Sequence, residues 1–445
     1  MRVQFRVTDG PDVGRNFLFD TRDVFLVGRA EDCAFQVADP QFSRRHFLLE
    51  VNPPNVLLRD LGSTNGTYVG DRRVAEQLLR HGDRLRCGQT VLEVDVLPDT
   101  EEPADPLLGT VLDEAAGLDL GALLGESSGL KEVRCSRCAK RAPNEGARGG
   151  AERVAWYCGD CQQALRDQPV SLPGYRVVKE LGRGGMGAVY QVEHERYGPR
   201  AVKMILPQAA LNEKVRKMFL REASTQGALE HPNIVRIFEL LEPHPGIFCM
   251  IMELVLGESG DELRERCGGR VEPLLAVHVI GQALDGLAYA HARGIVHRDI
   301  KGPNLLVRWP SAHQVEVKLA DFGLAKSYET SGASGFTRTG DLAGTLPYMP
   351  PEQVLSYKKV GPAADIYALG ATLYHHVTGA FPKEFPEDVN PIGVVLEGAI
   401  VPVRQRNPNL SPALASVIER ALANDPAQRW GSAEQMQRAL YQAVG

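Results

Sequence analysis

Short alternating runs of apolar and polar residues fill residues 1–97. Runs such as RVQFRV, FLFD, VFLVG, HFLLEV, NVLLRDL and VLEVDVL recur with turn residues between them. Several short strands separated by turn signals are typical of an all-β sandwich, and no helical periodicity competes strongly here. We therefore predict a β-sandwich domain over residues 1–97.

A mixed pattern of strands and helices extends over residues 169–445. The stretch YRVVKELGRGGMGAVYQVEHE predicts a strand, a turn and a strand, and AVKMI at 201–205 predicts another strand. The stretch VRKMFLREASTQGALE then has the spacing of a helix, and VEVKLA predicts a later strand. This order indicates an α+β domain, the second large domain of the chain.

Charge distinguishes two smaller pieces between these domains. Residues 98–130 hold 8 acidic residues and no basic one, with early prolines and scattered glycines. Repulsion between acidic side chains favours an extended linker, although its leucines leave open a short helix that docks on a partner or on the chain itself. Residues 131–168 reverse the balance, with 8 basic residues against 5 acidic ones.

The composition of the whole chain limits the class of protein. The net charge is −6 over 445 residues, which gives no general case for nucleic-acid binding. No run of about 18 apolar residues predicts a transmembrane helix. The start MRVQFRVTDG lacks the apolar region of a signal peptide, and 8 cysteines do not make a disulfide scaffold in a chain this long. We therefore expect a cytoplasmic protein.

Two Cys-x-x-Cys pairs lie in the basic segment, at 135–138 and 158–161. Each pair can place two thiolates on one side of a tight turn, and two pairs complete a tetrahedral zinc site. The spacing predicts a zinc-ribbon-like segment over residues 131–168, which the metal would largely hold folded because so short a segment has almost no core. A redox dithiol and nucleic-acid binding are the alternatives. The predicted zinc ligands are Cys135, Cys138, Cys158 and Cys161.

Three fragments of the first domain carry phosphate-binding chemistry: Gly28-Arg29, SRRH at 43–46 and STNGT at 63–67. Arginine, serine and threonine side chains donate hydrogen bonds to phosphate oxygens. An asparagine side chain can hold a peptide backbone through both its donor and its acceptor, and Asn-Gly is a strong turn signal between strands.

The ordered set, which includes DLGSTNGTYV, resembles the forkhead-associated (FHA) domain, a sandwich that binds phosphothreonine peptides through loops at one end. The resemblance implies that Arg29 and Ser43 contact the phosphate with help from Thr64. It further implies that Asn65 holds the peptide backbone and that Arg44 has a supporting basic role.

Two further positions of this pattern are expected to be structural, because His46 and Gly66 match positions that brace the loops. The alternative is a sandwich that keeps the pattern for its fold and binds no phosphopeptide.

The larger domain carries a set of motifs in a fixed order. Gly182, Gly184 and Gly187 form G-x-G-x-x-G, in which glycines let a backbone lie close over phosphates. A dinucleotide-binding unit would continue into a helix, whereas here the next element is the strand at 201–205. Three motifs follow: HRDIKGPN at 297–304, DFG at 321–323 and PPE at 350–352.

This set resembles the eukaryotic-like (Hanks-type) protein kinases of bacteria over about residues 175–440, and implies their two-lobed α+β fold with ATP and Mg²⁺ as cofactors. Lys203 would pair with the ATP phosphates and with Glu222, and Met252 would be the gatekeeper beside the adenine. The residues implied to bind ATP are Gly182, Gly184, Gly187, Val189, Lys203, Glu222, Glu253 and Val255.

The same resemblance implies roles in phosphoryl transfer to protein substrates. Asp299 would accept or orient the proton of the substrate hydroxyl, and Asn304 and Asp321 would hold Mg²⁺. Lys301 would neutralise the γ-phosphate, and a lysine there is the pattern of Ser/Thr kinases rather than Tyr kinases.

Two motifs depart from the family pattern, since GPN replaces the usual PxN and PPE replaces APE. Neither change touches a charged catalytic group. The alternative function is a catalytically weak scaffold or a phosphothreonine-binding adaptor, which predicts loss of a key polar residue. All four are present: Lys203, Asp299, Asn304 and Asp321.

The resemblance places an activation segment at 321–352. Thr337 and Thr339 are the predicted autophosphorylation sites, because a phosphothreonine there can pair with Arg298. Thr345 resembles the loop threonine that contacts the catalytic aspartate. The alternative for the first two threonines is a merely polar loop.

The expected partners of the first domain are phosphothreonine-containing proteins. Its own activation loop is among them, either in cis or between two chains that form a dimer during autophosphorylation, because tethering raises the effective concentration.

Overall fold

The structure is a computed structural model, and it describes most of the chain. Its described residues form two compact units, Met1–Asp105 with Ser331–Ser432 and Pro106–Thr330 with Ala433–Gly445. The described residues are 2–19, 23–31, 33–52, 55–97, 135, 138, 140, 158–161, 172–183, 187–205, 213–244, 247–311, 314–322, 344–355, 360–386 and 389–445. The predicted linker at 98–130 and most of the zinc-ribbon-like segment predicted at 131–168 lie outside them.

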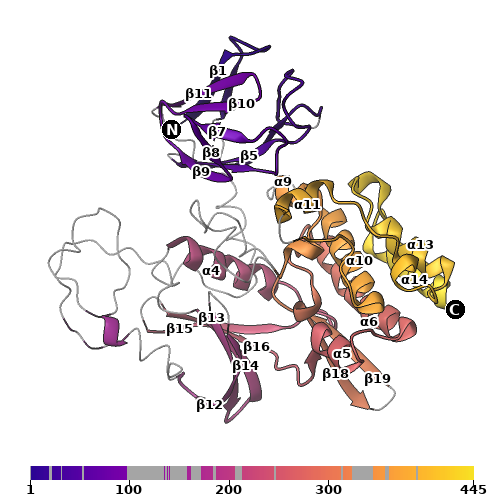
Figure 1. The fold of residues 1–445 in the computed structure, drawn as a ribbon. Coiled ribbons are helices and arrows are strands. Elements are labelled where there is room, and N and C mark those ends of the chain that lie inside the picture. Colours follow the sequence, from indigo (N-terminus) through magenta and orange to yellow (C-terminus); the bar gives the residue numbers. More distant parts are fainter. Residues whose placement is uncertain are drawn as a thin grey trace. The chain divides into compact units, whose positions relative to one another are not determined.

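The N-terminal domain begins with a sheet that has six described strands in the order β2-β1-β11-β10-β7-β8 (Figure 1). Val3, Phe5 and Val7 are buried while Arg6 between them is exposed, as the two-residue period of a strand requires. The strands are β1 (Arg2–Asp9), β2 (Asn16–Phe19), β7 (Thr67–Val69), β8 (Arg72–Val74), β10 (Arg84–Cys87) and β11 (Thr90–Leu97).

A second sheet of this domain has five described strands in the order β4-β3-β5-β6-β9. Side chains of both sheets form one buried core, with Phe5 from the first sheet and Leu49 and Leu58 from the second. The predicted β-sandwich is therefore confirmed. The strands are β3 (Asp23–Gly28), β4 (Phe35–Gln36), β5 (Phe47–Asn52), β6 (Asn55–Asp60) and β9 (Glu76–Leu79).

A buried charge cluster crosses three strands of this second sheet. Arg59 on β6 is almost fully buried, and its Nη2 lies 3.5 Å from Glu50 Oε1 on β5 and 3.5 Å from Glu76 Oε2 on β9. Burial raises the pKa of Glu50 to about 7; the Arg59 charge opposes this shift and the Glu76 charge adds to it. Glu50 therefore binds a proton in the folded domain at a pH where it is ionised in the unfolded chain.

Replacing Glu50 with glutamine is expected to flatten the dependence of domain stability on pH. A carboxyl whose pKa rises on folding stabilises the fold fully below its unfolded pKa near 4.5, and this contribution is lost as the pH rises through about 7. The slope in that window is up to about 1.4 kcal/mol per pH unit. Differential scanning calorimetry of the full chain between these pH values measures it, with the exposed Glu31→Gln as the control. A slope equal in Glu50→Gln and wild type would contradict the prediction.

The second compact unit contains a sheet with five described strands in the order β12-β13-β14-β16-β15. The helix α4 (Glu213–Gly227) packs against one face, where Phe219 and Ala223 join Ile205 and Phe248 in a buried cluster. The predicted strands and the following helix are therefore confirmed. The strands are β12 (Tyr175–Arg183), β13 (Gly187–His194), β14 (Gly198–Ile205), β15 (Ile237–His244) and β16 (Ile247–Met252).

The rest of this unit is built around the helix α6, which is buried over most of its length and lies against α14 and β19. A small sheet of three described strands has the order β17-β18-β19. The remaining elements are β17 (Glu258–Ser259), α5 (Gly260–Arg266), α6 (Pro273–His291), η2 (Gly302–Asn304), β18 (Leu305–Ser311), β19 (Gln314–Leu319) and α14 (Ala433–Val444).

The helical part of the first unit is centred on the helix α10, which is buried along almost its whole length. A Cβ on Gly370 would lie 2.7 Å from Ala421 Cβ, so the glycine allows α10 and α13 to approach closely. The elements are η3 (Leu346–Tyr348), α9 (Pro351–Leu355), α10 (Pro362–Thr378), α11 (Pro391–Glu397), α12 (Val403–Arg406), α13 (Pro412–Ala421) and η5 (Pro426–Gln428).

The fully buried Arg429, just after η5, forms an ion pair with Glu352 on α9. Both guanidinium amino groups of Arg429 donate to the Glu352 carboxylate, at 2.6 Å and 2.9 Å. Arg429 also donates to the backbone oxygens of Ala423, Ala363 and Asn424. Its side chain has no exposed surface, so these partners take the place of water around the guanidinium charge.

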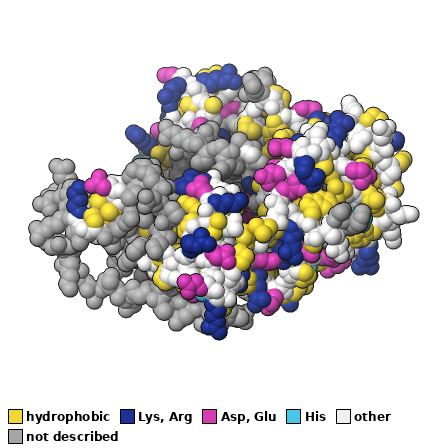
Figure 2. Space-filling model, turned by 90° about the horizontal axis from the view of Figure 1, so that it is seen from below, with side chains coloured by type: hydrophobic (Ala, Val, Ile, Leu, Met, Phe, Trp, Pro, Cys, Tyr) yellow, Lys and Arg dark blue, Asp and Glu magenta, His cyan; other side chains and the backbone are white. Residues whose placement is uncertain are grey.

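Among the described residues, no helix is both long and apolar enough to span a bilayer. On the face in Figure 2, basic and acidic side chains are interspersed with hydrophobic ones. This mixed surface is in keeping with the small net charge.

Candidate active site

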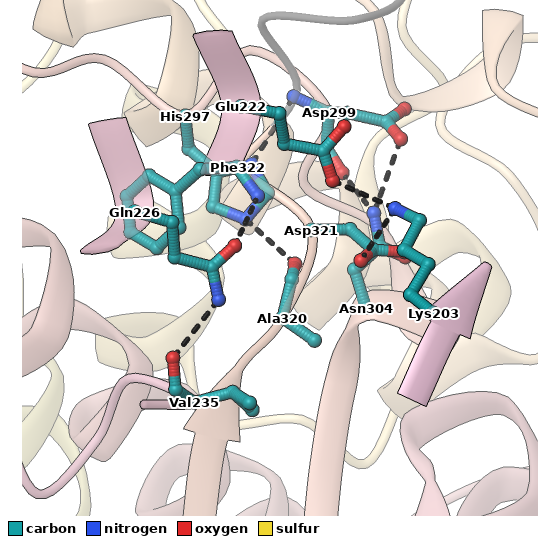
Figure 3. A network of polar contacts seen from close by, with 10 residues as sticks. All are labelled: Lys203, Glu222, Gln226, Val235, His297, Asp299, Asn304, Ala320, Asp321 and Phe322. Atoms are coloured by element: carbon teal, nitrogen blue, oxygen red, sulfur yellow. Dashed lines mark hydrogen bonds and ion pairs between the residues drawn. The ribbon is translucent and has the colours of Figure 1, made fainter. Parts of the chain in front are cut away.

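A lysine with two carboxylate partners lies at the centre of the candidate site (Figure 3). Lys203 on β14 donates from Nζ to Glu222 Oε1 on α4 at 2.7 Å and to Asp321 Oδ1 at 2.9 Å. The two carboxylates differ in environment, because the Glu222 side chain is 4% exposed and the Asp321 side chain 42%. Glu222 is therefore a buried partner of Lys203, and Asp321 can face a ligand.

Lys203 is stabilised in its charged form by both carboxylates of this trio. Burial by itself lowers the pKa of Lys203, but the Asp321 and Glu222 charges outweigh it, so the net shift is upward and the ammonium group stays protonated. Burial raises the pKa of Glu222, and the neighbouring Lys203 opposes that shift.

A second polar group surrounds Asp299. Asn304 donates from Nδ2 to the Asp299 backbone oxygen at 2.7 Å and to its Oδ2 at 3.1 Å. Lys301 Nζ lies 3.3 Å from Asp299 Oδ1. The carboxylate is thus held on two sides by donors from its own loop, with Asn304 supplied by η2.

The backbone around these carboxylates is held in an uncommon conformation. Arg298 and Asp321 have φ values of 66° and 57°, in the left-handed region that side chains other than glycine seldom occupy. His297 lies within 3.1 Å of the Ala320 backbone oxygen, and its ring contacts Phe322, so it bridges the two loops that carry Asp299 and Asp321 (Figure 3). Strain of this kind persists only where surrounding contacts hold it, and it is concentrated at functional sites.

Several apolar side chains pack on the buried cluster that lies under β14, the strand that carries Lys203. Val189, Val255, Leu306 and Ala320 pack against the buried cluster that includes Ala201. Val189 and Val255 were expected to bind ATP, whereas no role was expected for Ala201, Leu306 or Ala320. Their only sequence signal is position, because Ala201 precedes Lys203 by two residues and Leu306 follows Asn304 by two.

The expected phosphopeptide residues come together at one end of the sandwich. The backbone N–H of Thr64 donates to Ser43 Oγ at 3.1 Å, and Asn65 Nδ2 donates to the Gln41 backbone oxygen at 2.7 Å. Arg29 is exposed, and its Nε donates to the Phe42 backbone oxygen at 3.3 Å. Arg44 is exposed in the same loop.

Bracing contacts lie directly beneath these loops. His46 is fully buried, and its Nδ1 accepts from the Ser43 backbone N–H at 3.0 Å. Burial lowers the pKa of His46, which favours the neutral ring that can accept this hydrogen bond. Gly66 has φ of 76°, which favours glycine in this turn.

Two buried carboxylates also shape these loops, and sequence reasoning missed both. Asp60 accepts from the backbone N–H groups of Gly62 and Ser63 and from the hydroxyls of Ser63 and Thr67. Asp39 accepts from Gln41 N, Gln89 N and Thr90 Oγ1. The only available signal was an aspartate one or two residues before a turn, which is common in loops that bind nothing.

The four cysteines of the predicted zinc site lie together. Their sulfur atoms are all within 4.8 Å of one another, and Cys138 Sγ lies 3.6 Å from Cys158 Sγ. Tetrahedral zinc with bonds of about 2.3 Å would separate two sulfurs by about 3.8 Å. The backbone N–H of Cys158 also donates to Cys135 Sγ at 3.3 Å. This donor set fits a metal ion, while the ribbon fold itself stays a prediction.

Comparison with known proteins decides the family. Residues 175–441 match the protein kinase domain, and residues 25–88 match the FHA domain. This chain belongs to the protein kinase family. The match to the protein kinase domain covers more than half of the chain.

Similar proteins come from two bacteria. Serine/threonine-protein kinase PknJ of Mycobacterium tuberculosis is 34% identical over 277 residues, which are 61% of this chain and 45% of that protein. Serine/threonine-protein kinase Pkn1 of Myxococcus xanthus is 36% identical over 273 residues, 61% of this chain and 38% of that protein. The chain spans less than half the length of these two relatives. The crystal structure of the Mycobacterium tuberculosis PknI kinase domain matches with 28% identity and a TM-score of 0.47, over 62% of this chain and 98% of that one.

One departure of this kinase from the family motif has a physical reason. A Cβ on Gly302 would overlap Oδ1 of Asp261 at the start of α5, so the carboxylate takes the space that a larger residue at 302 would need. Glycine at 302 thus leaves room for the Asp261 side chain, and the turn that carries Asn304 is still formed.

The remaining expected residues of the kinase are placed as follows. Gly182 pairs with Val189 across β12 and β13, and Gly187 begins β13. The backbone N–H of Glu253 donates to the Arg236 backbone oxygen, and the Glu253 carboxylate forms an ion pair with Lys318. The predicted Gly184, Thr337 and Thr339 lie outside the described residues.

Proposed function

We propose that this protein is a Ser/Thr protein kinase that transfers the γ-phosphoryl group of ATP to hydroxyl groups of proteins. The observation that carries the proposal is the joint assembly of Lys203, Glu222, Asp321, Asp299 and Asn304 within one compact unit. Phosphoryl transfer needs mainly positioning and charge stabilisation, and this arrangement provides both.

Each polar group then has a role in the transfer. Lys203, oriented by Glu222, would hold the ATP phosphates. Asp299 would take the proton of the substrate hydroxyl. At the same time the hydroxyl oxygen would bond to the γ-phosphorus, and the bond from that phosphorus to the leaving ADP oxygen would break. Lys301, 3.3 Å from Asp299, would neutralise charge on the transferred group.

Oxygen ligands for Mg²⁺ are available at the same place. The exposed Asp321 carboxylate and the Asn304 amide oxygen are hard donors of the kind that Mg²⁺ prefers, so these two residues fit the ion. When bound, Mg²⁺ supplies charge neutralisation on the phosphates.

The test is transfer of labelled phosphate from Mg-ATP to the full chain and to an added protein, with Asp299→Asn beside the wild type. Labelling in the wild type alone supports the enzyme. Equal, near-zero labelling in both would overturn it and favour the adaptor.

We further propose that the FHA domain binds phosphothreonine peptides, including the kinase's own activation loop once Thr337 or Thr339 is phosphorylated. The support is the convergence of Arg29, Ser43 and the Thr64-Asn65 turn at one end of the sandwich. Tethering of the reader to the writer would compensate for modest intrinsic affinity, in cis or in a dimer.

The cysteine cluster is proposed to hold one structural zinc ion. Metal analysis of the purified full chain is expected to find one zinc per chain, and Cys161→Ser is expected to lose it together with thermal stability, because the site is tetrahedral with four thiolates. Cys267→Ser is the matched control, since Cys267 lies outside the cluster. Absence of zinc from the wild type, or equal zinc in Cys161→Ser, would contradict the assignment.

A further inference from the structure

An arginine that no motif includes lies directly beside the expected peptide-binding turn. A Cβ built on Gly66 would lie 2.5 Å from Arg73 Nε and 3.0 Å from its Cζ. The guanidinium group of Arg73 therefore covers the turn that Asn65 begins. Arg73 itself is exposed, so its charge faces solvent at this end of the sandwich.

Strand pairing extends this position into a row of side chains. Arg73 on β8 pairs with Tyr68 on β7, and Tyr68 pairs with Arg86 on β10. Directly paired residues in adjacent strands share a face, and Figure 1 shows these three strands side by side. Arg86 lies over the Tyr68 ring at 4.1 Å, which holds its guanidinium group in place. We call these residues the Arg73–Tyr68–Arg86 strip.

Three other arginines of the domain, Arg6, Arg15 and Arg59, have carboxylate partners that the strip lacks among the described residues. Arg6 lies 3.1 Å from Asp95, Arg15 lies 3.1 Å from Asp12, and Arg59 has two glutamate partners. Within the described part of the chain, no carboxylate forms an ion pair with Arg73 or Arg86. Two exposed guanidinium groups therefore remain available to a carboxylate from outside the domain.

The position of the strip determines which ligand it fits. Ser43 contacts the Thr64-Asn65 turn at the backbone N–H of Thr64, and Arg73 lies against the same turn at Gly66, two residues further on. A peptide whose phosphate is at Ser43 and whose backbone is held by Asn65 would reach Arg73 within a few residues of the phosphothreonine. A guanidinium fork there binds a carboxylate with two parallel hydrogen bonds.

We propose that the Arg73–Tyr68–Arg86 strip is a specificity subsite for an acidic side chain of the bound phosphopeptide. The proposal rests on phosphothreonine binding by this domain and adds the chemistry of the second contact. The chain's own loop fits this chemistry, since Asp341 follows Thr339 by two residues.

The test measures fluorescence anisotropy of labelled GFTRTGDLAG peptides phosphorylated on the second threonine. The protein is the full chain with Asp299→Asn, which prevents self-phosphorylation from occupying the site. One peptide keeps the aspartate and a second has asparagine there, and further alanine-rich phosphothreonine peptides carry one aspartate at successive positions on either side. We expect an acidic preference of about two- to five-fold, the size of an exposed ion pair, that declines at high salt.

The variants separate the two proposals. Arg73→Gln is expected to remove the acidic preference and keep phosphate-dependent binding, whereas Arg29→Ala is expected to remove binding of every phosphopeptide. Arg72→Gln is the matched control, because Arg72 is the exposed neighbour on the same strand, contacts Gln77 and points to the opposite face.

Three results would overturn these assignments. An acidic preference that survives Arg73→Gln refutes the strip alone. The absence of a preference at every aspartate position also refutes the strip, with phosphate binding intact. Equal affinity for phosphorylated and unphosphorylated peptides refutes phosphothreonine binding, and the specificity subsite with it.

Discussion

Asp299→Asn is expected to lower phosphoryl transfer about 10²- to 10⁴-fold, the usual contribution of a positioned general base. Asp299 Oδ2 accepts a hydrogen bond from Asn304, and Oδ1 forms an ion pair with Lys301 at 3.3 Å, so each carboxylate oxygen faces a donor or a cation. An asparagine side chain can present its oxygen to Asn304 or to Lys301, but it must then point its NH₂ group at the other of these two residues. The variant therefore loses its basic oxygen and its negative charge while it keeps the shape of the side chain.

Initial rates of label transfer from Mg-ATP measure this effect, and nucleotide affinity and thermal unfolding are recorded beside them. Both are expected to change little, because Lys203, Glu222 and Asp321 are untouched. Asp285→Asn, at an exposed position of α6, is the matched control for the loss of one carboxylate. An Asp299→Asn enzyme with more than about a tenth of wild-type activity would contradict the role of this residue.

Arg429→Met is expected to destabilise the helical part of the first unit by about 3 kcal/mol, the lower end of the cost of removing one partner of a buried ion pair, because the Glu352 side chain is 27% exposed. The substitution leaves the Glu352 carboxylate and the backbone oxygens of Ala423, Ala363 and Asn424 without this donor. It also removes the cation that lies 4.9 Å from the centre of the Tyr367 ring.

Urea unfolding of the full chain followed by tryptophan fluorescence measures this loss, because Trp430 is the next residue in the chain. Adding Glu352→Gln to Arg429→Met is expected to cost less than the sum of the single substitutions, since the carboxylate has already lost its partner. Arg438→Met, at an exposed position of α14, controls for the general loss of an arginine. A loss below about 1 kcal/mol in Arg429→Met would show that the pair does not stabilise this region.

The sequence predicted the order of the domains and the charged residues of the kinase site because these depend on residue identity and spacing. Lys203, Asp299 and Asp321 can be recognised from their own motifs, whatever fold the residues between those motifs adopt. Ala201, Leu306 and Ala320 were not singled out, because an isolated apolar residue carries no sign in the sequence of the cluster that it will join.

The FHA domain shows a second reason for incomplete prediction. Asp39 and Asp60 are ordinary aspartates in sequence, and only burial reveals that each organises several loop donors. Arg73 is seven residues beyond Gly66, and it lies beside that glycine because β7 and β8 form a hairpin. Contacts made through strand pairing depend on register, which a local motif does not contain.

The direction of β11 limits which parts of the chain can enter the phosphopeptide loops. Thr90 at its start contacts Asp39 beside those loops, whereas Leu97 at its end pairs with Arg2 at the far end of the sheet. The strand covers about 23 Å at 3.3 Å per residue. Thr100 is three residues past Leu97 and can return at most about 11 Å, so it cannot occupy the site of its own domain. A phosphothreonine bound in cis must therefore lie at least about seven residues past Leu97, the number of extended residues that spans about 23 Å, and one nearer than this can be read only by another molecule.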